Sequence, residues 1–382
     1  MVNLKGGLKY MMEYEGKYTK GKILIDNFEG NIVNQLYSVL NHPAFEGCNV
    51  SVMPDCHIGK GIMVGFTSTM KDMIVPSVIG VDIGCGVSAY NLGRLKKVKA
   101  DKLDKFIRKN IPTGSGTRDK YIVEPSFIKP LIDKMNMDYK KAMGSLGTLG
   151  GSNHFIEIDK DDNNNFWLVI HSGSRSFGFI VAKYHQRKAK EVMKKIYGGS
   201  AYHGLEYLPM DQGGKEYIQD MQLAQKYASL NRETMARLII EKFYKLHFET
   251  LEKIETIHNY IDLKDNVIRK GAISAHKGER LIIPFNMQFG CVIGTGKSSK
   301  ENNYSAPHGC GRILARSNVN KSKKALEQYK KAMKGIYTTS VSKNTIAESP
   351  MAYKKPKLIL ENISDLIDID FFVKPVYNLK PE

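Results

Sequence analysis

The segment IMVGFTSTMKDMIVPSVIGVDIGCGVSAYNL, residues 62–92, contains three β-rich runs in close succession. The runs are Ile62–Met70, Ile74–Val81 and Val87–Leu92, and they are punctuated by Gly65, Gly80, Gly84 and Gly86. Apolar runs of this length between turn residues predict strands. Because no helical pattern separates them, they predict an α+β fold with clustered strands, not a strictly alternating strand–helix fold.

The rest of the chain contains both helical and strand patterns, without a repeat or a linker. Helices are expected at 101–110, 126–143, 176–197, 232–258 and 320–335. Strands are expected at His154–Ile158, Phe166–His171, 267–295 and Phe371–Leu379. The pattern at 232–258 is the longest, since apolar residues recur there at three- and four-residue steps and form one face. Candidate functional residues lie in both halves, so we expect one composite domain, residues 1–382, in which helices flank β-sheets.

The composition indicates a globular protein that favours polyanions. The chain has 382 residues, of which 42% are hydrophobic and 25% charged, and a formal net charge of +18. That charge favours nucleic acid or nucleotides, although a solvated lysine-rich surface would give the same excess. No apolar run approaches the ~20 residues that span a bilayer, and the first residues lack the apolar core of a signal peptide. We therefore expect a cytoplasmic protein without a membrane partner.

The five cysteines are irregularly spaced and form no Cys-x-x-Cys pair; they are Cys48, Cys56, Cys85, Cys291 and Cys310. An odd, irregular set does not resemble a disulfide framework. It suits a reducing compartment, where a cysteine is a metal ligand or a small core residue.

Ser305-Ala-Pro-His308-Gly-Cys-Gly-Arg312 isolates one histidine between a proline turn and two glycines. Glycine keeps side-chain bulk away from a reactive neighbour and lets backbone N–H groups approach a phosphate. The planar guanidinium of Arg312 also suits phosphate oxygens. Taken alone, the segment fits a structural histidine in a glycine-rich turn equally well.

A second set of residues is of metal-ligand type. Asp82 and Cys85 lie three residues apart among glycines, and His154, His171 and His258 each lie at the end of an expected element. Aspartate, cysteine and histidine together are typical of a transition metal, not of Mg²⁺ or Ca²⁺. Five donors exceed one tetrahedral shell, so two metals that share the thiolate are expected, and ligand type alone points to zinc.

Other polar residues suggest contacts with phosphate. Arg175 follows His171 in a Ser/Gly-rich turn and suits phosphate capture, or is an exposed surface group. Asn153 would orient a phosphate or a ribose, or cap a turn. His57 and Lys60, in the turn MPDCHIGKG, are candidate RNA or phosphate contacts. The remaining histidines, which we expect at the surface or in the core, are His42, His185, His203, His247 and His276.

Together these segments resemble the RtcB family of RNA-splicing ligases. The motifs follow the family's order between residues 53 and 380 and read MPDCHIGKG, GVDIGCG, LGGSNHFIE, HSGSRSFG, HNY, RKGA, SAPHGCGR and VKPVYNLK. The resemblance implies an enzyme of RNA repair or tRNA splicing. Such an enzyme uses GTP and Mn²⁺ to join an RNA 3′-phosphate or 2′,3′-cyclic phosphate to a 5′-hydroxyl.

The resemblance also implies roles for individual residues. His308 would attack the α-phosphate of GTP and carry GMP as a phosphoramidate; GMP would pass to the RNA 3′-phosphate, and the 5′-hydroxyl would attack the activated end. Two Mn²⁺ ions, with Zn²⁺ as competitor, would be held by Asp82, Cys85, His154, His171 and His258, with Cys85 as the bridge. Arg175 would hold an RNA phosphate beside the catalytic groups His308 and Cys85. The guanine nucleotide would contact Asn153, Phe155, Glu157, Asn259, Pro284, Asn286, Met287, Cys291, His308, Gly309, Cys310, Gly311, Tyr353 and Lys380.

The sequence departs from the family pattern near the nucleotide. The usual Pro-Gly-Ser-Met loop reads Pro284-Phe-Asn-Met287, Cys291 stands where serine is common, and Cys310 where alanine is usual. These changes keep open a variant that guanylylates RNA or DNA 3′-phosphates without joining them. Two functions of a different kind also fit the residues: a metal phosphodiesterase that uses no nucleotide, and a non-catalytic RNA-binding scaffold. The resemblance leaves an activating protein partner open, and the sequence does not determine the oligomeric state.

Overall fold

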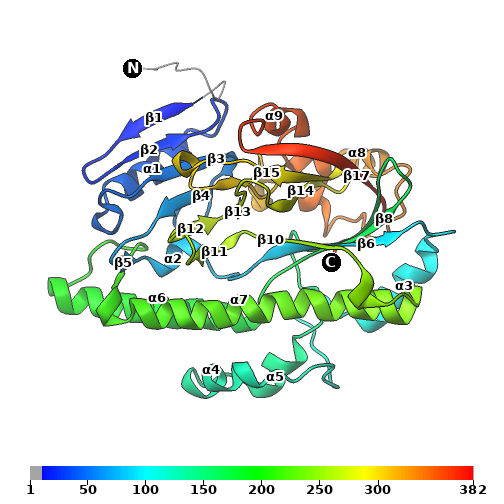
Figure 1. Cartoon of the computed structure of the whole chain (residues 1–382), viewed down its shortest axis with the longest axis horizontal. Helices are drawn as coiled ribbons and strands as arrows, with labels where there is room; N and C mark the ends of the chain where they lie inside the picture. Colours follow the sequence, from blue (N-terminus) through cyan, green and yellow to red (C-terminus); the bar gives the residue numbers. More distant parts are fainter. Residues whose placement is uncertain (1–10, 382) are drawn as a thin grey trace.

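Residues 11–381 are described by the computed structural model, and their strands form two large sheets with long helices across one side (Figure 1). The first sheet has the order β1-β2-β3-β4-β12-β11. In that order the strands are Met12–Glu15, Lys20–Ile23, Val50–His57, Val64–Thr69, Val267–Lys270 and Asn259–Asp262. Neighbouring strands are antiparallel except β2 and β3, which are parallel.

The second sheet has the order β10-β6-β8-β7-β17-β15-β14 and is antiparallel throughout. In that order the strands are Lys253–Ile257, Gly86–Gly93, Phe166–Ser172, Phe155–Lys160, Ile367–Leu379, Gly290–Gly296 and Arg280–Asn286. The sequence FWLVIHS makes β8 an almost continuously buried strand, as its apolar run predicts. The antiparallel pairing and clustered strands confirm the α+β class.

Two long helices, α6 (Arg175–Tyr197) and α7 (Gly214–Arg237), lie side by side along the sheets (Figure 1). In α6 the buried residues recur at helical spacing and are Phe177, Gly178, Val181, Ala182, His185, Ala189 and Met193. The ring of Phe177 stacks on that of Tyr227 in α7, with centroids 4.6 Å apart. One face of each helix therefore belongs to the core, and the opposite face of α6 is free for other contacts.

Shorter elements connect these layers. The helices are α1 Asn31–Leu40, α2 Pro76–Ile79, α3 Ala100–Asn110, α4 Lys129–Lys134, α5 Tyr139–Gly144, α8 Lys323–Ala332 and α9 Pro356–Leu360. Two small antiparallel pairs join β5 (Met73–Ile74) to β9 (Leu208–Pro209) and β13 (Ala272–Ser274) to β16 (Ser305–Pro307). No helix within residues 11–381 is both long and apolar enough to span a bilayer. The prediction of one domain includes residues 1–10 and 382, outside the described part, and stays a prediction.

The predicted helix at 232–258 is wrong at both ends. The helix begins at Gly214, continues as a π-helical turn over Leu238–Tyr244, and ends at Lys245, whose φ of 61° is left-handed. Residues 253–257 instead form β10, which pairs with β6. In β10, Ile254 and Thr256 lie two residues apart and are both buried, which is the alternation of a strand. The apolar residues of this segment also fit helical spacing, but the structure forms a strand there.

Two other predicted elements are also corrected. Residues 74–81 do not form a strand, because Pro76 begins the short helix α2; proline has a φ suited to a first helical turn. The helix expected at 126–143 is divided into a short turn, α4 and α5, because Asn136 between them has a φ of 49°. The strands and helices predicted at 87–92, 101–110, 166–171 and 176–197 are confirmed.

A buried arginine on α7 ties three chain segments together. The side chain of Arg232 is fully buried, and its Nη2 lies 2.8 Å from Oε1 of Glu255 on β10. Its Nη1 donates to the carbonyl oxygens of Gly84 (2.9 Å) and Ser172 (2.8 Å). Gly84 lies two residues before β6 and Ser172 ends β8, so Arg232 fixes the edge of the second sheet where those strands meet.

We expect Arg232→Met to lower the free energy of unfolding by about 3 kcal/mol, because it leaves a partly buried carboxylate and two carbonyls without their donor. Arg237→Met is the matched control on the same helix, since Arg237 pairs with the more exposed Glu233 and Glu241; its cost should stay below about 1 kcal/mol. Denaturant unfolding measures both, and equal losses would contradict the role given to Arg232.

Candidate metal and nucleotide site

The second sheet brings the predicted metal ligands to one edge. Cys85 directly precedes β6, His154 directly precedes β7, His171 lies near the end of β8, and His258 follows β10. The antiparallel register places these strand ends together: Gly86 pairs with both Ser172 and Ile257, and Phe155 pairs with His171. Asp82 reaches the same edge from the turn after α2. Segments that are far apart in sequence therefore meet because alternate antiparallel strands begin and end at the same side.

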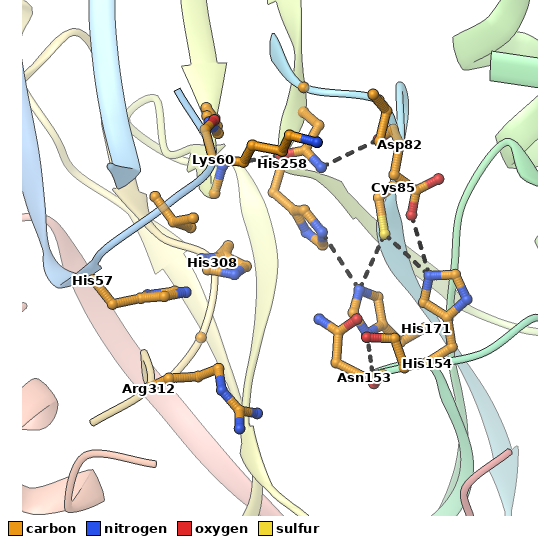
Figure 2. A pocket seen from close by; sticks show the side chains of 18 of the residues that line it. His57, Lys60, Asp82, Cys85, Asn153, His154, His171, His258, His308 and Arg312 are labelled. Carbon is orange, nitrogen blue, oxygen red and sulfur yellow. Dashed lines mark hydrogen bonds and ion pairs between the residues drawn. The ribbon is translucent and has the colours of Figure 1, made fainter. Parts of the chain in front are cut away.

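The five side chains converge (Figure 2). Sγ of Cys85 lies 3.3 Å from Nε2 of His171 and 3.6 Å from Nε2 of His154. Nε2 of His171 lies 3.4 Å from Nε2 of His258, and Nε2 of His154 lies 3.2 Å from Oδ2 of Asp82. The donors form two groups, Cys85–His171–His258 and Asp82–Cys85–His154, each with its ligand atoms within 4.8 Å of one another. The two groups have only the sulfur in common, so Cys85 would be a ligand of both cations if each group held one.

The second ring nitrogens fix the orientation of two of the imidazoles. Nδ1 of His154 lies 2.7 Å from the carbonyl oxygen of Leu149, and Nδ1 of His171 lies 3.2 Å from that of Asn153. A hydrogen bond donated by Nδ1 leaves Nε2 with its lone pair, the form that binds a metal. Burial also lowers the pKa of His171 and His258, which favours neutral rings. The residues present therefore fit a transition metal.

His308 directly follows the strand β16 and lies beside this cluster. Because Ala272 pairs with Pro307, His308 faces Gly271, whose N–H donates to the carbonyl oxygen of His258 (2.6 Å). The rings of His258 and His308 have centroids 4.8 Å apart. A side chain on Gly271 would collide with Val64, so the close approach of these segments requires glycine there.

Asp55, a residue that our sequence analysis did not single out, holds His308. Oδ2 of this fully buried carboxylate lies 2.6 Å from Nδ1 of His308, at an angle outside ideal hydrogen-bond geometry. The same oxygen accepts the N–H of Gly309 at 3.2 Å. The feature that could have identified Asp55 is a charged residue within β3, a strand whose other residues are almost all buried. Because Nδ1 faces the carboxylate of Asp55, Nε2 is the ring nitrogen of His308 that points away from it.

One cavity of about 940 Å³ contains the cluster and His308. All the predicted nucleotide and phosphate contacts line it except Cys291. Eight basic side chains and four carboxylates line it, so it presents an excess of positive charge. This volume lies in the range of small-molecule sites.

The wall opposite the cluster is organised around Glu348, another residue that the sequence did not reveal. Its carboxylate lies 3.3 Å from Nη1 of Arg312 and 2.8 Å from Nε of Arg316, and it accepts a hydrogen bond from the hydroxyl of Tyr353. Although burial acts in the opposite direction, Lys380 and Arg316 hold the pKa of Glu348 below its usual range. The network orients two arginines at the cavity surface, where they can face an anion.

Several predicted nucleotide contacts are already engaged with the protein. The side chain of Asn259 donates to the carbonyl oxygen of Asp82 (3.1 Å) and accepts from the N–H of Gly271 (3.1 Å). Oδ1 of Asn286 accepts the N–H groups of Gln288 and Phe289, both at 3.0 Å. Cys291 is buried in β15 outside the cavity lining. Asn259 thus joins the metal cluster to the His308 segment, while the position of Cys291 does not agree with the expected nucleotide contact.

The predicted phosphate contacts differ in character. Arg175 begins α6 with a left-handed φ of 53°, uncommon for a residue with a side chain, and its Nε donates to Oγ1 of Thr148 (3.2 Å). Its guanidinium is thereby held at the cavity beside the cluster. Burial lowers the pKa of His57 to about 4, so its ring is neutral near pH 7 and offers a hydrogen bond, not a charge. Lys60 lines the cavity, and its carbonyl oxygen accepts from Nζ of Lys270 (2.9 Å).

A thiol, three imidazoles and a carboxylate beside an arginine-lined cavity are groups that suit metal-assisted phosphate chemistry. The chain belongs to the RtcB family: the family described as "tRNA-splicing ligase RtcB" matches residues 35–137 and 131–381. It is 29% identical over 371 residues to the RNA-splicing ligase RtcB of Escherichia coli strain K12, covering 87% of this chain and 90% of that protein. It is 25% identical to the tRNA-splicing ligase RtcB of Methanococcus maripaludis, covering 98% and 95%.

Replacing Cys85 tests the shared-thiol arrangement. We expect Cys85→Ala to weaken Mn²⁺ binding more than about tenfold at both donor groups, because both lose the same sulfur. Titration calorimetry and metal analysis after dialysis measure affinity and stoichiometry. Cys310→Ala is the matched control, because that thiol is buried in the same cavity wall but donates to the carbonyl oxygen of Lys354. Loss of only one of two bound ions in Cys85→Ala would contradict the shared ligand.

Glu157 and Asp159 of β7 form a pair of buried carboxyls. Both side chains point to the same side of the strand and lie beside Cys291. Neither oxygen of Asp159 has a hydrogen-bond partner within residues 11–381. Burial raises the pKa of both carboxyls, that of Glu157 to about 7. Between the ordinary pKa of a carboxyl and these raised pKa values, the two carboxyls are therefore protonated in the native state but ionised in the unfolded chain.

The contribution of these two carboxyls to stability should consequently fall as pH rises toward 7, since at these two groups the native state binds more protons than the unfolded state in this window. Glu157→Gln removes the titration and keeps an oxygen for Asn378, so it should be more stable than wild type at pH 8 by about 1–3 kcal/mol. The difference should shrink toward pH 5. Denaturant unfolding across this range measures it, with the exposed Glu361→Gln as control; a pH-independent difference would be the contrary result.

Proposed function

We propose that this chain is a GTP- and Mn²⁺-dependent RNA ligase that joins a 3′-phosphate or 2′,3′-cyclic phosphate end to a 5′-hydroxyl end. The names of its relatives support an RNA-joining activity. The observation that carries the proposal is the position of His308: held by Asp55 at Nδ1, it lies against His258 of the metal cluster inside one cationic cavity.

His308 would carry out the first step. Its free Nε2 would attack the α-phosphorus of GTP, forming a nitrogen–phosphorus bond while the bond to pyrophosphate breaks. Nδ1 keeps its proton, and the carboxylate of Asp55 would stabilise the positive charge that the ring acquires. Arg312, Arg316 and Lys380 face the cavity and would offset the negative charge of the nucleotide.

The later steps would use the same cavity. An oxygen of the RNA 3′-phosphate would attack the phosphorus on His308, so that GMP moves to the RNA end and the imidazole is released. The 5′-hydroxyl would then attack the 3′-phosphate, lose its proton and expel GMP. A cyclic phosphate would first be opened by water. Arg175, held beside the cluster, would position an RNA phosphate.

Mn²⁺ would be held by the two donor groups and would supply neutralisation of phosphate charge. A thiolate and imidazoles also bind Zn²⁺ strongly, so we expect Zn²⁺ to compete and inhibit. All five cysteines are buried and free, which supports a reducing compartment and hence a cytoplasmic enzyme. RNA repair and tRNA splicing are the processes that such an activity would serve.

Incubation with GTP labelled at the α-phosphate tests the first step. Wild type should form an acid-labile covalent GMP adduct that depends on added Mn²⁺, and His308→Ala should form none. Asp55→Asn keeps the imidazole but removes the balancing carboxylate, so its adduct should form about 10²-fold more slowly. The peripheral His203→Ala is the control and should label as wild type does. Labelling of His308→Ala at the wild-type rate would exclude this nucleophile.

Addition of a 3′-phosphate oligonucleotide and a 5′-hydroxyl acceptor distinguishes ligation from capping and from hydrolysis. Joined product supports the ligase, whereas guanylylated RNA or DNA ends without joining would favour capping. The altered loop keeps capping as the alternative; in this loop Phe285 is buried and Asn286 binds its own turn. Hydrolysis of the 3′-end without any adduct would favour a metal phosphodiesterase.

A further inference from the structure

Helix α6 leads out of the candidate site with one continuous face along the cavity. Arg175, its first residue, lies beside the metal cluster, and Phe179, Lys183, Gln186 and Lys190 also line the cavity. The steps of four, four, three and four residues place all five on one side of the helix. Fifteen residues at ~1.5 Å each make this row about 22 Å long.

The row consists of side chains that the core does not use. Phe179 is 46% exposed, Lys183 and Lys190 are exposed, and Gln186 is half-buried. Nζ of Lys183 lies 5.8 Å from the ring centre of Phe179 and 3.3 Å from Oε1 of Gln186. Phe179 is therefore an exposed aromatic ring next to a cationic side chain, on the face of α6 that lines the cavity.

The opposite wall of this part of the cavity comes from two other segments. Ser77 and Ile79 belong to α2, and Gly204 and Glu206 belong to the loop after α6. Oγ of Ser77 donates to the carbonyl oxygen of Gly204 at 2.7 Å, which ties the two segments together. The cavity therefore extends along α6 as a groove with two walls, and Glu206 is the one carboxylate among its described lining residues in this part.

Cations spaced along a groove with an interleaved aromatic ring are the features by which proteins bind single-stranded nucleic acid. Lysines pair with successive phosphates, and a ring stacks on a base whatever its sequence. An acidic polypeptide could pair with the lysines, but it would leave the ring of Phe179 without a stacking partner. The groove also opens at Arg175, where an RNA phosphate must arrive if the proposed ligation occurs.

We propose that the row Phe179–Lys183–Gln186–Lys190 binds a single-stranded segment of an RNA substrate, with its reactive end at Arg175. Measured from Arg175 to Lys190, this ~22 Å face corresponds to roughly six nucleotides at ~3.4 Å each, the spacing of stacked nucleotides along a helical strand. Phe179 stacks on a base near the reactive end, and Lys183 and Lys190 contact phosphates farther along. This inference rests on the proposed function for the identity of the strand but not for the binding itself.

Fluorescence anisotropy with labelled RNA of twelve and of three nucleotides tests the groove. Phe179→Ala and the double variant Lys183→Gln/Lys190→Gln should each bind the twelve-nucleotide RNA about tenfold more weakly. Their affinity for the three-nucleotide RNA should change less, because it reaches only the first part of the row. In the double variant the slope of log K against log salt should decrease by about 1.4, that is ~0.7 for each lost phosphate contact.

Lys194→Gln/Lys195→Gln is the matched control, since these lysines lie on the same helix, are exposed and do not line the cavity. It should bind both RNAs as wild type does, and thermal unfolding should show that all variants are folded. A 3′-phosphate and a 5′-hydroxyl version of each RNA show which substrate end occupies the groove. Equal weakening by the control pair, or unchanged RNA binding in both groove variants, would overturn the inference.

Two further readouts separate this inference from other outcomes. Polyglutamate that competes with RNA for wild type and loses affinity in Phe179→Ala would indicate a protein partner and overturn the inference. GMP labelling reports the proposed function independently, because it involves no RNA. If wild type shows no GMP labelling but its RNA binding depends on the groove residues, the ligase proposal is refuted and the groove is supported. If wild type is labelled but RNA binding does not depend on the groove residues, the ligase proposal is supported and the groove is refuted.

Discussion

The site depends on the antiparallel register of four strands in the second sheet. Because β6 and β7 begin where β8 and β10 end, residues adjacent to these ends must lie at one edge of the sheet. Arg232 stabilises that edge, because its side chain donates hydrogen bonds to the carbonyl oxygens of Gly84 and Ser172. A one-residue slip of β8 would turn His171 to the other face of the sheet and break the donor cluster.

A second constraint joins the two sheets through His308. Its strand β16 pairs with β13, which follows β12 of the first sheet, and Asp55 comes from β3 of that sheet. His258 lies between β10 of the second sheet and β11 of the first, and Asn259 is the first residue of β11. The metal donors and the candidate nucleophile therefore belong to different sheets. They meet in one cavity that is lined by buried imidazoles and by arginines held in ion pairs; for the proposed reaction, such preorganisation would require little movement.

Particular elements show where prediction from sequence succeeded. The apolar run FWLVIHS forms the buried strand β8, as predicted, and the structure brings the five predicted metal ligands together in two groups of donor atoms. The helix predicted at 232–258 failed because Leu251, Ile254 and Ile257 fit helical spacing, while pairing with β6 makes the segment a strand. Local apolar spacing cannot distinguish these outcomes when the partner strand lies more than 150 residues away.

The sequence by itself determined the chemistry that the chain can support: the types of its donor residues, the isolated histidine in its glycine-rich turn, the positive charge and the family motifs. Only the tertiary structure decided which groups act together. It paired Asp55 with His308, set Glu348 between two arginines, engaged Asn259 within the protein and removed Cys291 from the cavity. The physical reason is that reactivity follows from residue type, whereas distance, burial and charge balance follow from the long-range pairing of strands.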